Sequence, residues 1–201
     1  KPRLCIGYNV TRNATHKRGF NVRILITGVG GFVGRHLFNT LCKQYPDAII
    51  HGTAIDEPPR MGDRLRYHLI DLKNYTVISD LIAEIQPDQI FHLAAQASPR
   101  RSFVIPWETL ENNIKSQLNI IQSCIALKLQ PRILVISSAE IYGPVRPEQQ
   151  PINEDAPLRP TNPYGVSKIT QDMLGLQYYL SHKLPILRVR PFNHFGPGQS
   201  E

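Results

Sequence analysis

The sequence contains 201 residues, of which 41% are hydrophobic and 19% charged, so it is long enough to bury a core and its composition excludes collagen-like and disordered proteins. Its net charge of +7 suggests a polyanionic partner, but residues 1–20 hold five basic residues and no acid, which leaves +2 for residues 21–201. The charge therefore does not predict nucleic-acid binding, and residues 1–20 are interpreted as a basic, disordered extension.

From residue 22 onward, short apolar runs alternate with amphipathic stretches, a pattern typical of a parallel sheet covered by helices. Strands are predicted at 22–27, 48–55, 67–70, 89–93, 132–137 and 186–190. Helices are predicted at 32–45, 75–85, 107–129 and 163–182. The proline-rich segment 144–163 predicts a long surface loop, because proline is excluded from regular helices and central strands.

The apolar runs and the cysteines of the sequence predict a cytoplasmic protein. No run approaches the roughly 20 apolar residues of a membrane helix, and the start of the chain has no apolar signal-peptide region. The cysteines, Cys5, Cys42 and Cys124, are odd in number and far apart, with no histidine at ligand spacing beside them. They predict a reducing compartment and no metal site, with Cys42 and Cys124 as buried helix residues.

A glycine-rich turn at 27–34 joins the first predicted strand to the first predicted helix. Gly28, Gly31 and Gly34 have the spacing G-x-x-G-x-x-G, which departs from G-x-G-x-x-G but lies in the strand-to-helix context that a dinucleotide site requires. Glycines there let the backbone approach a pyrophosphate, and the helix N-terminus attracts its charge. The turn and the element order together predict an α/β fold, a Rossmann-type doubly wound parallel sheet.

The choice between NAD and NADP depends on the end of the second strand. Asp56, about twenty-eight residues after Gly28, is placed to accept hydrogen bonds from a ribose diol and to repel a 2′-phosphate. It could instead be an ordinary turn acid, and Arg60 and Arg64 nearby could bind a 2′-phosphate. NAD is therefore favoured over NADP only modestly.

Tyr164 and Lys168 lie four residues apart in a predicted helix, so that phenol and ammonium share one face. A nearby lysine charge favours the phenolate and would bring the tyrosine pKa toward neutral pH, as proton exchange with a secondary alcohol or ketone requires. The same spacing recurs at Tyr179 and Lys183. That second pair lies at the tail of the helix, where core and solvent roles are expected.

A second candidate for the catalytic site lies at the end of the predicted strand 132–137. Open α/β sheets bind ligands at the carboxyl ends of their strands. This segment contains Ser137, Ser138 and Glu140. Ser137 is interpreted as a backbone-capping hydroxyl. Glu140 would point to the same side as Ser138 if the chain stays extended.

The turn at 27–34, Asp71-Leu72 and His92-Leu93-Ala94-Ala95 follow one another as in the extended short-chain dehydrogenase/reductases that act on nucleotide-activated sugars. Residues 22–200 resemble this family, the NAD-dependent epimerase/dehydratases. The resemblance implies that Asp71 lies beside the adenine and that Asn113 supports the site. Taken alone, Asp71 could be a helix-start acid and Asn113 a solvated residue. The implied cofactor-binding set is Gly28, Gly31, Phe32, Val33, Gly34, Asp56, Asp71, Leu72, Leu93, Ala94, Ala95, Tyr164, Lys168 and Pro191.

Within that family the segments 163–168 and 190–199 are similar to the branch that handles GDP-sugars, with its GDP-4-keto-6-deoxy-hexose reductases and GDP-mannose 4,6-dehydratases. The resemblance implies that Pro191 abuts the nicotinamide and that Asn193 contacts the sugar nucleotide. His194 could orient this segment or touch the ligand. Glu140 could serve a dehydratase as a base, whereas Ala139 stands where glucose-nucleotide dehydratases carry an acidic residue and cannot replace it.

These residues and the resemblance together predict a cytoplasmic enzyme that reduces the C4 ketone of a GDP-sugar with NAD or NADP. Tyr164 would supply the proton, Lys168 would hold the nicotinamide ribose, and Ser138 and Glu140 would complete the catalytic set, with Ser138, Glu140 and Asn193 binding substrate. The alternatives are a 4,6-dehydratase or epimerase, and a non-catalytic NAD-binding module. The resemblance also implies a homodimer through helices 107–129 and 163–182, and a smaller C-terminal substrate lobe that is mostly missing from these 201 residues.

Overall fold

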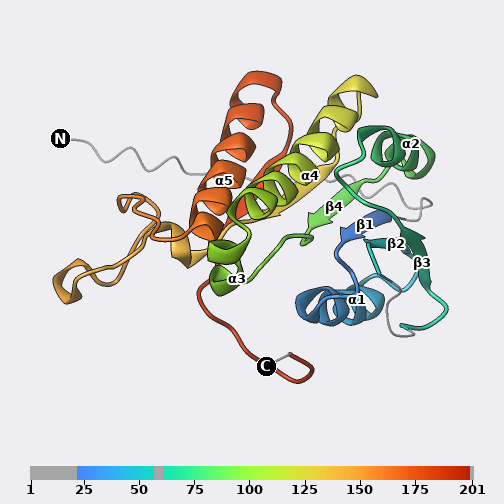
Figure 1. The fold of residues 1–201 in the computed structure, drawn as a ribbon. Coiled ribbons are helices and arrows are strands. Elements are labelled where there is room, and N and C mark those ends of the chain that lie inside the picture. The colour runs from blue at the N-terminus through green and yellow to red at the C-terminus, as the bar shows by residue number, and fades with distance from the viewer. Residues whose placement is uncertain (1–21, 57–60, 200–201) are drawn as a thin grey trace, which may run out of the picture.

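The computed structural model describes residues 22–56 and 61–199, so the predicted disordered extension at 1–20, Cys5 and Arg60 lie outside the described residues. The described chain forms a six-stranded parallel sheet with the strand order β3-β2-β1-β4-β5-β6 (Figure 1). The strands are β1 (Arg23–Thr27), β2 (Ile49–Ala54), β3 (Leu65–Leu69), β4 (Gln89–His92), β5 (Arg132–Ile136) and β6 (Ile186–Val189). This is the predicted Rossmann-type sheet.

Helices cover both faces of the sheet. The helix α1 (Phe32–Gln44) lies on one face, and α2 (Tyr75–Ile85), α4 (Pro106–Ala126) and α5 (Pro163–His182) lie on the other (Figure 1). A core containing Ile24, Ile26 and Phe38 fills the space beneath α1, and a larger one containing Leu25, Ile82 and Ile120 lies beneath α2 and α4. Burial of this apolar surface is the main force that stabilises the layers.

The sheet register brings the carboxyl ends of the central strands together. Thr27 at the end of β1 pairs with Thr53 of β2 on one side and with His92 of β4 on the other. The strand order reverses between β1 and β4, because β2 lies on one side of β1 and β4 on the other. Ligands of open α/β sheets bind at this kind of switch point, so the sequence motifs at strand ends meet at one edge.

The predicted elements are confirmed, with ends shifted by at most three residues, and one helix was not predicted. That helix is α3 (Pro99–Val104), which begins with Ser98 as N-cap and proline in its first turn. Ser-Pro is a helix-start signal, but a helix of six residues is too short to show an apolar period. As predicted for its helix, Cys124 is buried in α4, and burial raises the pKa of its thiol to about 12, whereas Cys42 in α1 is only half-buried.

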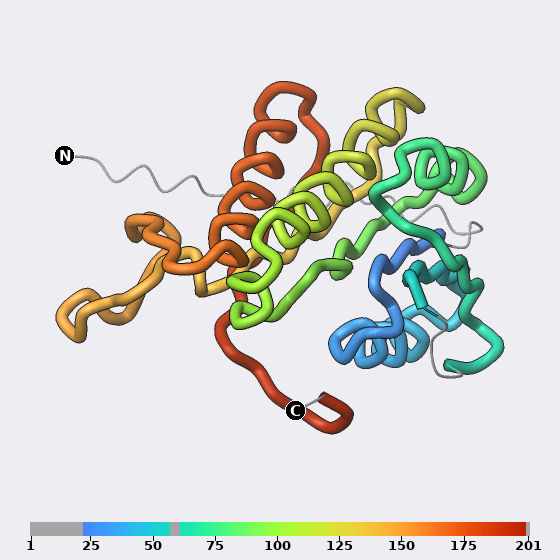
Figure 2. The backbone as a smooth tube through the Cα atoms, viewed as in Figure 1, coloured from blue at the N-terminus to red at the C-terminus, as the bar shows by residue number. Residues whose placement is uncertain are grey.

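Two long segments leave the sheet near β5 and β6. The proline-rich segment extends away from the body of the molecule, orange in Figure 2, and its regular structure is limited to the short 3-10 helix η2 (Pro147–Gln149). The segment after β6, red in Figure 2, returns toward α1, where Arg35 donates to the Gly198 carbonyl at 2.7 Å and His36 contacts the Pro197 carbonyl at 3.0 Å. In the described part of the chain no helix is long and apolar enough to cross a membrane.

Candidate active site

The glycine-rich turn after β1 is packed backbone against backbone. A Cβ atom on Gly34 would lie 2.5 Å from the Gly28 carbonyl oxygen and 2.6 Å from that of Val29. Gly28 has a φ of +67°, and a Cβ there would lie 2.9 Å from backbone atoms of Ala94. The two glycines are therefore required by close approach within the chain itself, whether or not a ligand is bound.

Gly31 differs from these two because it is exposed and serves as the N-cap of α1. Among the described residues, no side chain caps this helix N-terminus, and its first turn contains no acidic residue. The first N–H groups of α1 can therefore donate to an anion, and the positive end of the helix dipole favours one. The turn thus fits the pyrophosphate of a dinucleotide.

Asp56 follows β2 at the same sheet edge and is exposed. Its backbone carbonyl accepts a hydrogen bond from the Tyr67 hydroxyl, which anchors the end of the strand. Arg64 does not serve the alternative role of binding a 2′-phosphate, because its guanidinium donates to the Cys42, Tyr45 and Pro46 carbonyls at the end of α1. Asp71 is exposed and pairs with the backbone N–H and ammonium of Lys73.

The other proposed cofactor residues lie in three segments, after β3, at the end of β4 and at the start of α1. Leu72 is buried, and Leu93, Ala94 and Ala95 are half-buried at the end of β4. The backbone N–H groups of Leu93 and Ala94 donate to Oγ1 of Thr27 at 3.1 and 3.2 Å, which ties the β4 end to the turn. At the start of α1, Val33 is 40% exposed and Phe32 is half-buried.

Ser138 and Glu140 belong to the short 3-10 helix η1 (Ala139–Ile141) and its cap, which follow β5. The chain does not stay extended after Ser138, the condition for Glu140 to point to the same side, because Oγ of Ser138 accepts from the Glu140 N–H at 3.2 Å and turns the backbone. The Glu140 carboxylate accepts from Nδ2 of Asn162 at 2.9 Å, and Asn162 is the N-cap of α5. As interpreted, Ser137 is structural: its buried hydroxyl donates to the Lys168 carbonyl.

Tyr164 lies in the first turn of α5 and is 8% exposed. Burial raises the pKa of its phenol, a hydrogen bond with Ser138 opposes the rise, and the Glu140 carboxylate adds to it. The predicted lowering of this pKa by Lys168 is therefore not found in the structure. The phenol keeps its proton at neutral pH and can donate it.

Lys168 is buried one turn after Tyr164, and its Nζ lies 5.7 Å from the centre of the Tyr164 ring. Its ammonium donates to the Ile136 carbonyl and to Oε1 of Gln171, each at 2.9 Å. Burial lowers the pKa of Lys168 to about 8. An ammonium has three N–H donors, and these contacts among the described residues use two.

A buried chain of polar groups connects Lys168 to the glycine-rich turn. Gln171 offers Oε1 to the ammonium, so its Nε2 faces Nε2 of His92 at 3.4 Å, and Nδ1 of His92 lies 2.9 Å from Oγ1 of Thr27. Because the amide donates, Nε2 of His92 must accept, and the neutral ring carries its proton on Nδ1. Burial lowers the pKa of His92 to about 3, which keeps the ring neutral.

Asn113 is fully buried in α4 and not solvated. Its Oδ1 accepts from the Gln96 N–H at 2.7 Å, and its Nδ2 donates to the Gln96 carbonyl and to Oγ of Ser167 at 2.8 Å. It therefore braces α5 and the loop after β4. The second tyrosine–lysine pair has the structural role that was expected, since Lys183 caps the end of α5 and Tyr179 is partly exposed.

The segment after β6 begins beside the loop that holds Ser138 and Glu140. The Pro191 carbonyl accepts from the Ala139 N–H at 2.9 Å. Farther on, Asn193 is exposed, and the His194 ring stacks on Phe32 with centroids 6.2 Å apart. The contact of His194 with Phe32 shows that it orients this segment over the start of α1.

Several residues of the site were not predicted from the sequence. Gln171 and Asp172 lie in α5, three and four residues after Lys168, and Asn162 directly precedes the proline that begins the helix. The burial of Asp172 makes it conspicuous in the structure, because its carboxylate is 0% exposed and pairs with Arg188 and Arg190. A helix position four residues after Lys168 shares its face, which was the available clue.

Comparisons with known proteins identify the family of the chain. Residues 25–201 match the family described as GDP-mannose 4,6 dehydratase. GDP-6-deoxy-D-mannose reductase from Pseudomonas aeruginosa is 36% identical over 179 residues, which are 89% of this chain and 54% of that protein. The chain thus spans about half the length of this curated relative.

Solved structures share the fold. The structure of RMD from Pseudomonas aeruginosa complexed with NADPH matches with a TM-score of 0.73 and 34% identity, over 90% of this chain and 56% of that chain. The UDP-glucose 4-epimerase from Thermus thermophilus in complex with NAD matches with a TM-score of 0.81 and 27% identity, over 89% and 58%. These relatives include a reductase and an epimerase, and two of the structures hold a nicotinamide dinucleotide.

Proposed function

The chain belongs to the GDP-mannose 4,6-dehydratase family, and from this premise we propose that it acts as a nucleotide-sugar oxidoreductase that reduces the C4 ketone of a GDP-4-keto-6-deoxy-hexose. The observation that carries the proposal is the meeting of three groups at one sheet edge. The protonated phenol of Tyr164, the Ser138 hydroxyl and the buried Lys168 ammonium come together where β5 ends and α5 begins.

Each of these groups has a defined part in reducing a ketone. A bound NAD(P)H supplies the hydride for C4. Tyr164 donates its proton to the C4 oxygen, and the nearby Lys168 ammonium lowers the energy of the phenolate that remains. Ser138 holds the carbonyl oxygen by a hydrogen bond and also contacts the phenol. The raised pKa of Tyr164 suits this direction, because a phenol that keeps its proton is ready to act as an acid.

The cofactor residues of this proposal are those around the glycine-rich turn. The uncapped N-terminus of α1 would bind the pyrophosphate, Asp56 the adenosine ribose, and Pro191 would border the nicotinamide. NAD is the favoured cofactor because Asp56 would repel a 2′-phosphate, although the related reductase structure from Pseudomonas aeruginosa contains NADPH.

The deciding experiment uses the protein expressed from its complete reading frame. With a GDP-4-keto-6-deoxy-hexose and NAD(P)H, we expect oxidation of the dinucleotide and loss of the ketone. Tyr164→Phe should reduce turnover by at least about a thousandfold while leaving the binding of NAD(P)H unchanged. Turnover by the variant equal to that of the wild type would refute the assignment.

A dehydratase or epimerase on the same scaffold is the second candidate, and Glu140 is the observation that favours it. This carboxylate lies close enough to Tyr164 to raise the pKa of the phenol, so it could remove a proton from the sugar carbon next to the ketone. Incubation with GDP-mannose and NAD(P) separates the candidates. Conversion of GDP-mannose to GDP-4-keto-6-deoxy-mannose and water supports a dehydratase, whereas reduction of the 4-keto-6-deoxy derivative without reaction of GDP-mannose supports the reductase.

A non-catalytic NAD-binding module is the third candidate, from a different class. It would bind NAD(H) through the same turn but convert no nucleotide sugar. The measurement of turnover alongside NAD(H) binding distinguishes it, because binding with no turnover of any nucleotide sugar would leave the module as the function.

We also propose a homodimer that uses α4 and α5. Trp107 on α4 is 74% exposed, and Val166 and Met173, seven residues apart on α5, are both exposed on one side of that helix. Large apolar side chains exposed on neighbouring helices are characteristic of protein interfaces. Sedimentation equilibrium tests it: Trp107→Glu should convert a dimer to a monomer, and a monomeric wild type would contradict the proposal.

A further inference from the structure

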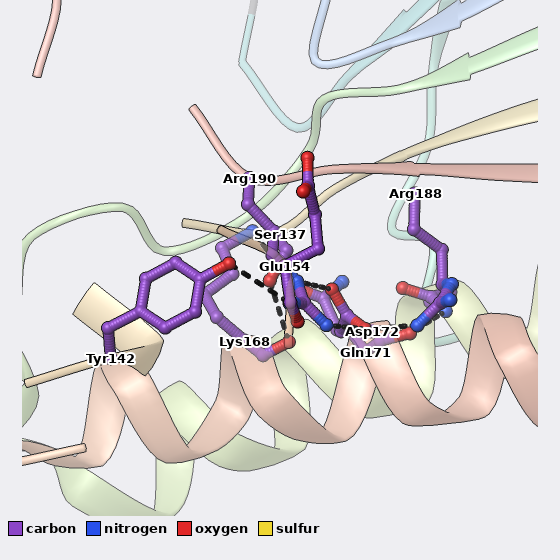
Figure 3. Close-up of polar contacts among 9 residues, drawn as sticks. Ser137, Tyr142, Glu154, Lys168, Gln171, Asp172, Arg188 and Arg190 are labelled. Atoms are coloured by element: carbon purple, nitrogen blue, oxygen red, sulfur yellow. Dashed lines mark hydrogen bonds and ion pairs between the residues drawn. The ribbon is translucent and has the colours of Figure 1, made fainter. Parts of the chain in front are cut away.

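We propose that Asp172 and Arg190 are positioning residues, which hold the loop of Ser138 and Glu140 in place against helix α5. The inference rests on the proposed function, because it assigns a catalytic consequence to the position of that loop. Figure 3 shows the network, in which Arg188 and Arg190 reach the buried Asp172 on α5 and Arg190 also contacts Tyr142 and Glu154.

The anchor of the network is a carboxylate with no exposed surface. Oδ1 of Asp172 accepts from Nη1 of Arg188 at 2.5 Å and from Nη2 of Arg190 at 3.1 Å, while Oδ2 accepts from Nε of Arg190 at 2.9 Å. Burial alone would raise the pKa of Asp172, but the hydrogen bonds and charges of Arg190 and Arg188 lower it. The group is therefore a charged, bidentate acceptor fixed in the middle of the helix.

Arg190 carries this anchorage to the catalytic loop. Its Nη1 donates to the Tyr142 hydroxyl at 3.0 Å and to the Glu154 carbonyl at 2.8 Å, and its guanidinium lies 5.6 Å from the centre of the Tyr142 ring. Tyr142 directly follows η1, the turn that Ser138 caps. One guanidinium therefore joins helix α5, the catalytic loop and the proline-rich segment.

The location of the network connects it to the chemistry. Asp172 lies one turn after Lys168 and two turns after Tyr164 on the same helix. Ser138 belongs to the loop and Tyr164 to the helix, so the contact between their hydroxyls depends on how the loop is placed against α5. A displacement of about 1 Å between groups that must act together can reduce turnover by two orders of magnitude.

Substitutions of Arg188 and Arg190 can distinguish a network that positions the loop from one that only stabilises the fold. Both pair with Asp172, but within the described residues the contacts of Arg188 run to Asp172, whereas those of Arg190 continue to the loop. Arg188→Lys therefore weakens the ion pair and keeps the tether to the loop. Arg190→Lys keeps a positive charge but loses the planar fork that reaches Asp172 and Tyr142 together.

The test compares Arg190→Lys, Arg188→Lys and Tyr142→Phe in the protein expressed from its complete reading frame. The last variant keeps the ring beneath the guanidinium and removes only the hydroxyl. We expect Arg190→Lys and Tyr142→Phe to lower kcat about tenfold with an unchanged KM for the dinucleotide, and to speed hydrogen exchange of the amides of Ile141 and Tyr142. Arg188→Lys should leave kcat and the exchange rates of these amides within about twofold of the wild type, even if the variant melts at a lower temperature.

The exchange measurement keeps this inference separate from the proposed function. If the wild type turns over no nucleotide sugar, the proposed function fails, but the amides after Ser138 still report whether Arg190 holds the loop. Equal exchange and equal kcat in Arg190→Lys and Arg188→Lys would overturn the inference and leave an ion pair that acts on stability alone. If Arg190→Lys does not fold, Tyr142→Phe decides by the same two measurements.

Discussion

The glycine-rich turn after β1 and the loop after β5 lie at the same edge of the sheet, but different contacts hold them. In the turn, the N–H groups of Gly28 and Val29 donate to the Thr53 carbonyl, and Gly34 packs against the backbone. In the loop, side chains supply the contacts: Ser138 caps η1, and Glu140 accepts from Asn162. The turn therefore depends on the absence of side chains and the loop on the presence of particular ones.

Because of this difference, we expect the turn to be sensitive to added side-chain atoms and the loop with helix α5 to be sensitive to pH. The turn is shaped by steric exclusion, so a single methyl group can disrupt it, while a change of pH leaves it unaltered. The proposed catalytic region contains Lys168, whose pKa is lowered to about 8 by burial, and Tyr164, whose pKa is raised. Binding and chemistry are therefore expected to respond to different perturbations, although the two regions are joined by the chain from Thr27 through His92 to Gln171.

The largest effect is expected from Gly34→Ala. The added Cβ would lie 2.5 to 2.7 Å from the carbonyl oxygens of Gly28 and Val29 and from Cα of Val29, and backbone atoms cannot move aside as the end of a side chain can. We expect unfolding free energy to fall by about 3 kcal/mol and dinucleotide binding to be lost. Urea unfolding and titration with NAD(H) measure the two effects.

Gly31→Ala is the matched control in the same turn. Its Cβ would lie 3.3 Å from the Gly28 carbonyl oxygen, and Gly31 is exposed. Its stability should fall by less than about 1 kcal/mol, while its affinity for the dinucleotide drops, because the added methyl group would lie at the N-terminus of α1, where the pyrophosphate is proposed to bind. Equal losses of stability in the two variants would contradict the steric account of the turn.

The next effect arises at Lys168, in the proposed catalytic region, and depends on pH. The pKa of Lys168 is about 8 in the folded chain and 10.5 as its ordinary value, so between these values the unfolded chain binds more protons. Stability attributable to Lys168 therefore increases as pH rises, by about 2 kcal/mol between pH 7.5 and 9.5. Lys168→Met should remove this increase. The difference between the two proteins, measured by urea unfolding below pH 10, cancels the other titrating groups.

An increase that persists unchanged in Lys168→Met would show that another group titrates in this range. Above pH 10 the raised pKa of Tyr164 acts in the opposite sense, because the unfolded chain then loses the phenolic proton more readily than the folded one. The pH dependence is therefore specific to the loop and helix α5. Gly31→Ala, in the turn, should retain the wild-type slope.

The fold and the two motifs were predictable from the sequence because they repeat in regular patterns. Alternating apolar runs predict the sheet, three glycines predict the turn, and a four-residue spacing places Tyr164 and Lys168 on one helix face. The contacts around Lys168 were not predictable, because Gln171, His92 and Thr27 come from three elements and no local pattern joins them. The pKa of Tyr164 was misjudged for a similar reason, since burial depends on the whole fold.

Gln171→Glu should have a smaller effect on the pH dependence of stability. It changes the contact between Gln171 and Lys168, which was not predicted from the sequence. A carboxylate 2.9 Å from Nζ of Lys168 in place of the amide would stabilise the ammonium and raise the pKa of Lys168 by about one to two units. The increase in stability between pH 7.5 and 9.5 should then shrink or move to higher pH. Gln171→Met should move it to lower pH, because the ammonium loses an acceptor. Shifts of the same sign in both variants would show that the contact does not set this pKa.

The smallest effect is expected from Asp56→Asn, at the exposed end of β2. Asp56 lies outside the packed turn, so the substitution leaves unchanged the helix N-terminus that would bind the pyrophosphate. The variant should therefore still bind both NAD and NADP. An asparagine no longer repels a 2′-phosphate and accepts more weakly from a ribose hydroxyl. The ratio of the Kd values for NADP and NAD should therefore fall about tenfold, as measured by fluorescence titration. Asp71→Asn is the control, because a residue beside the adenine would alter both Kd values equally. An unchanged ratio in Asp56→Asn would make Asp56 a turn residue, and preference for NAD would then have to come from the shape of the turn itself.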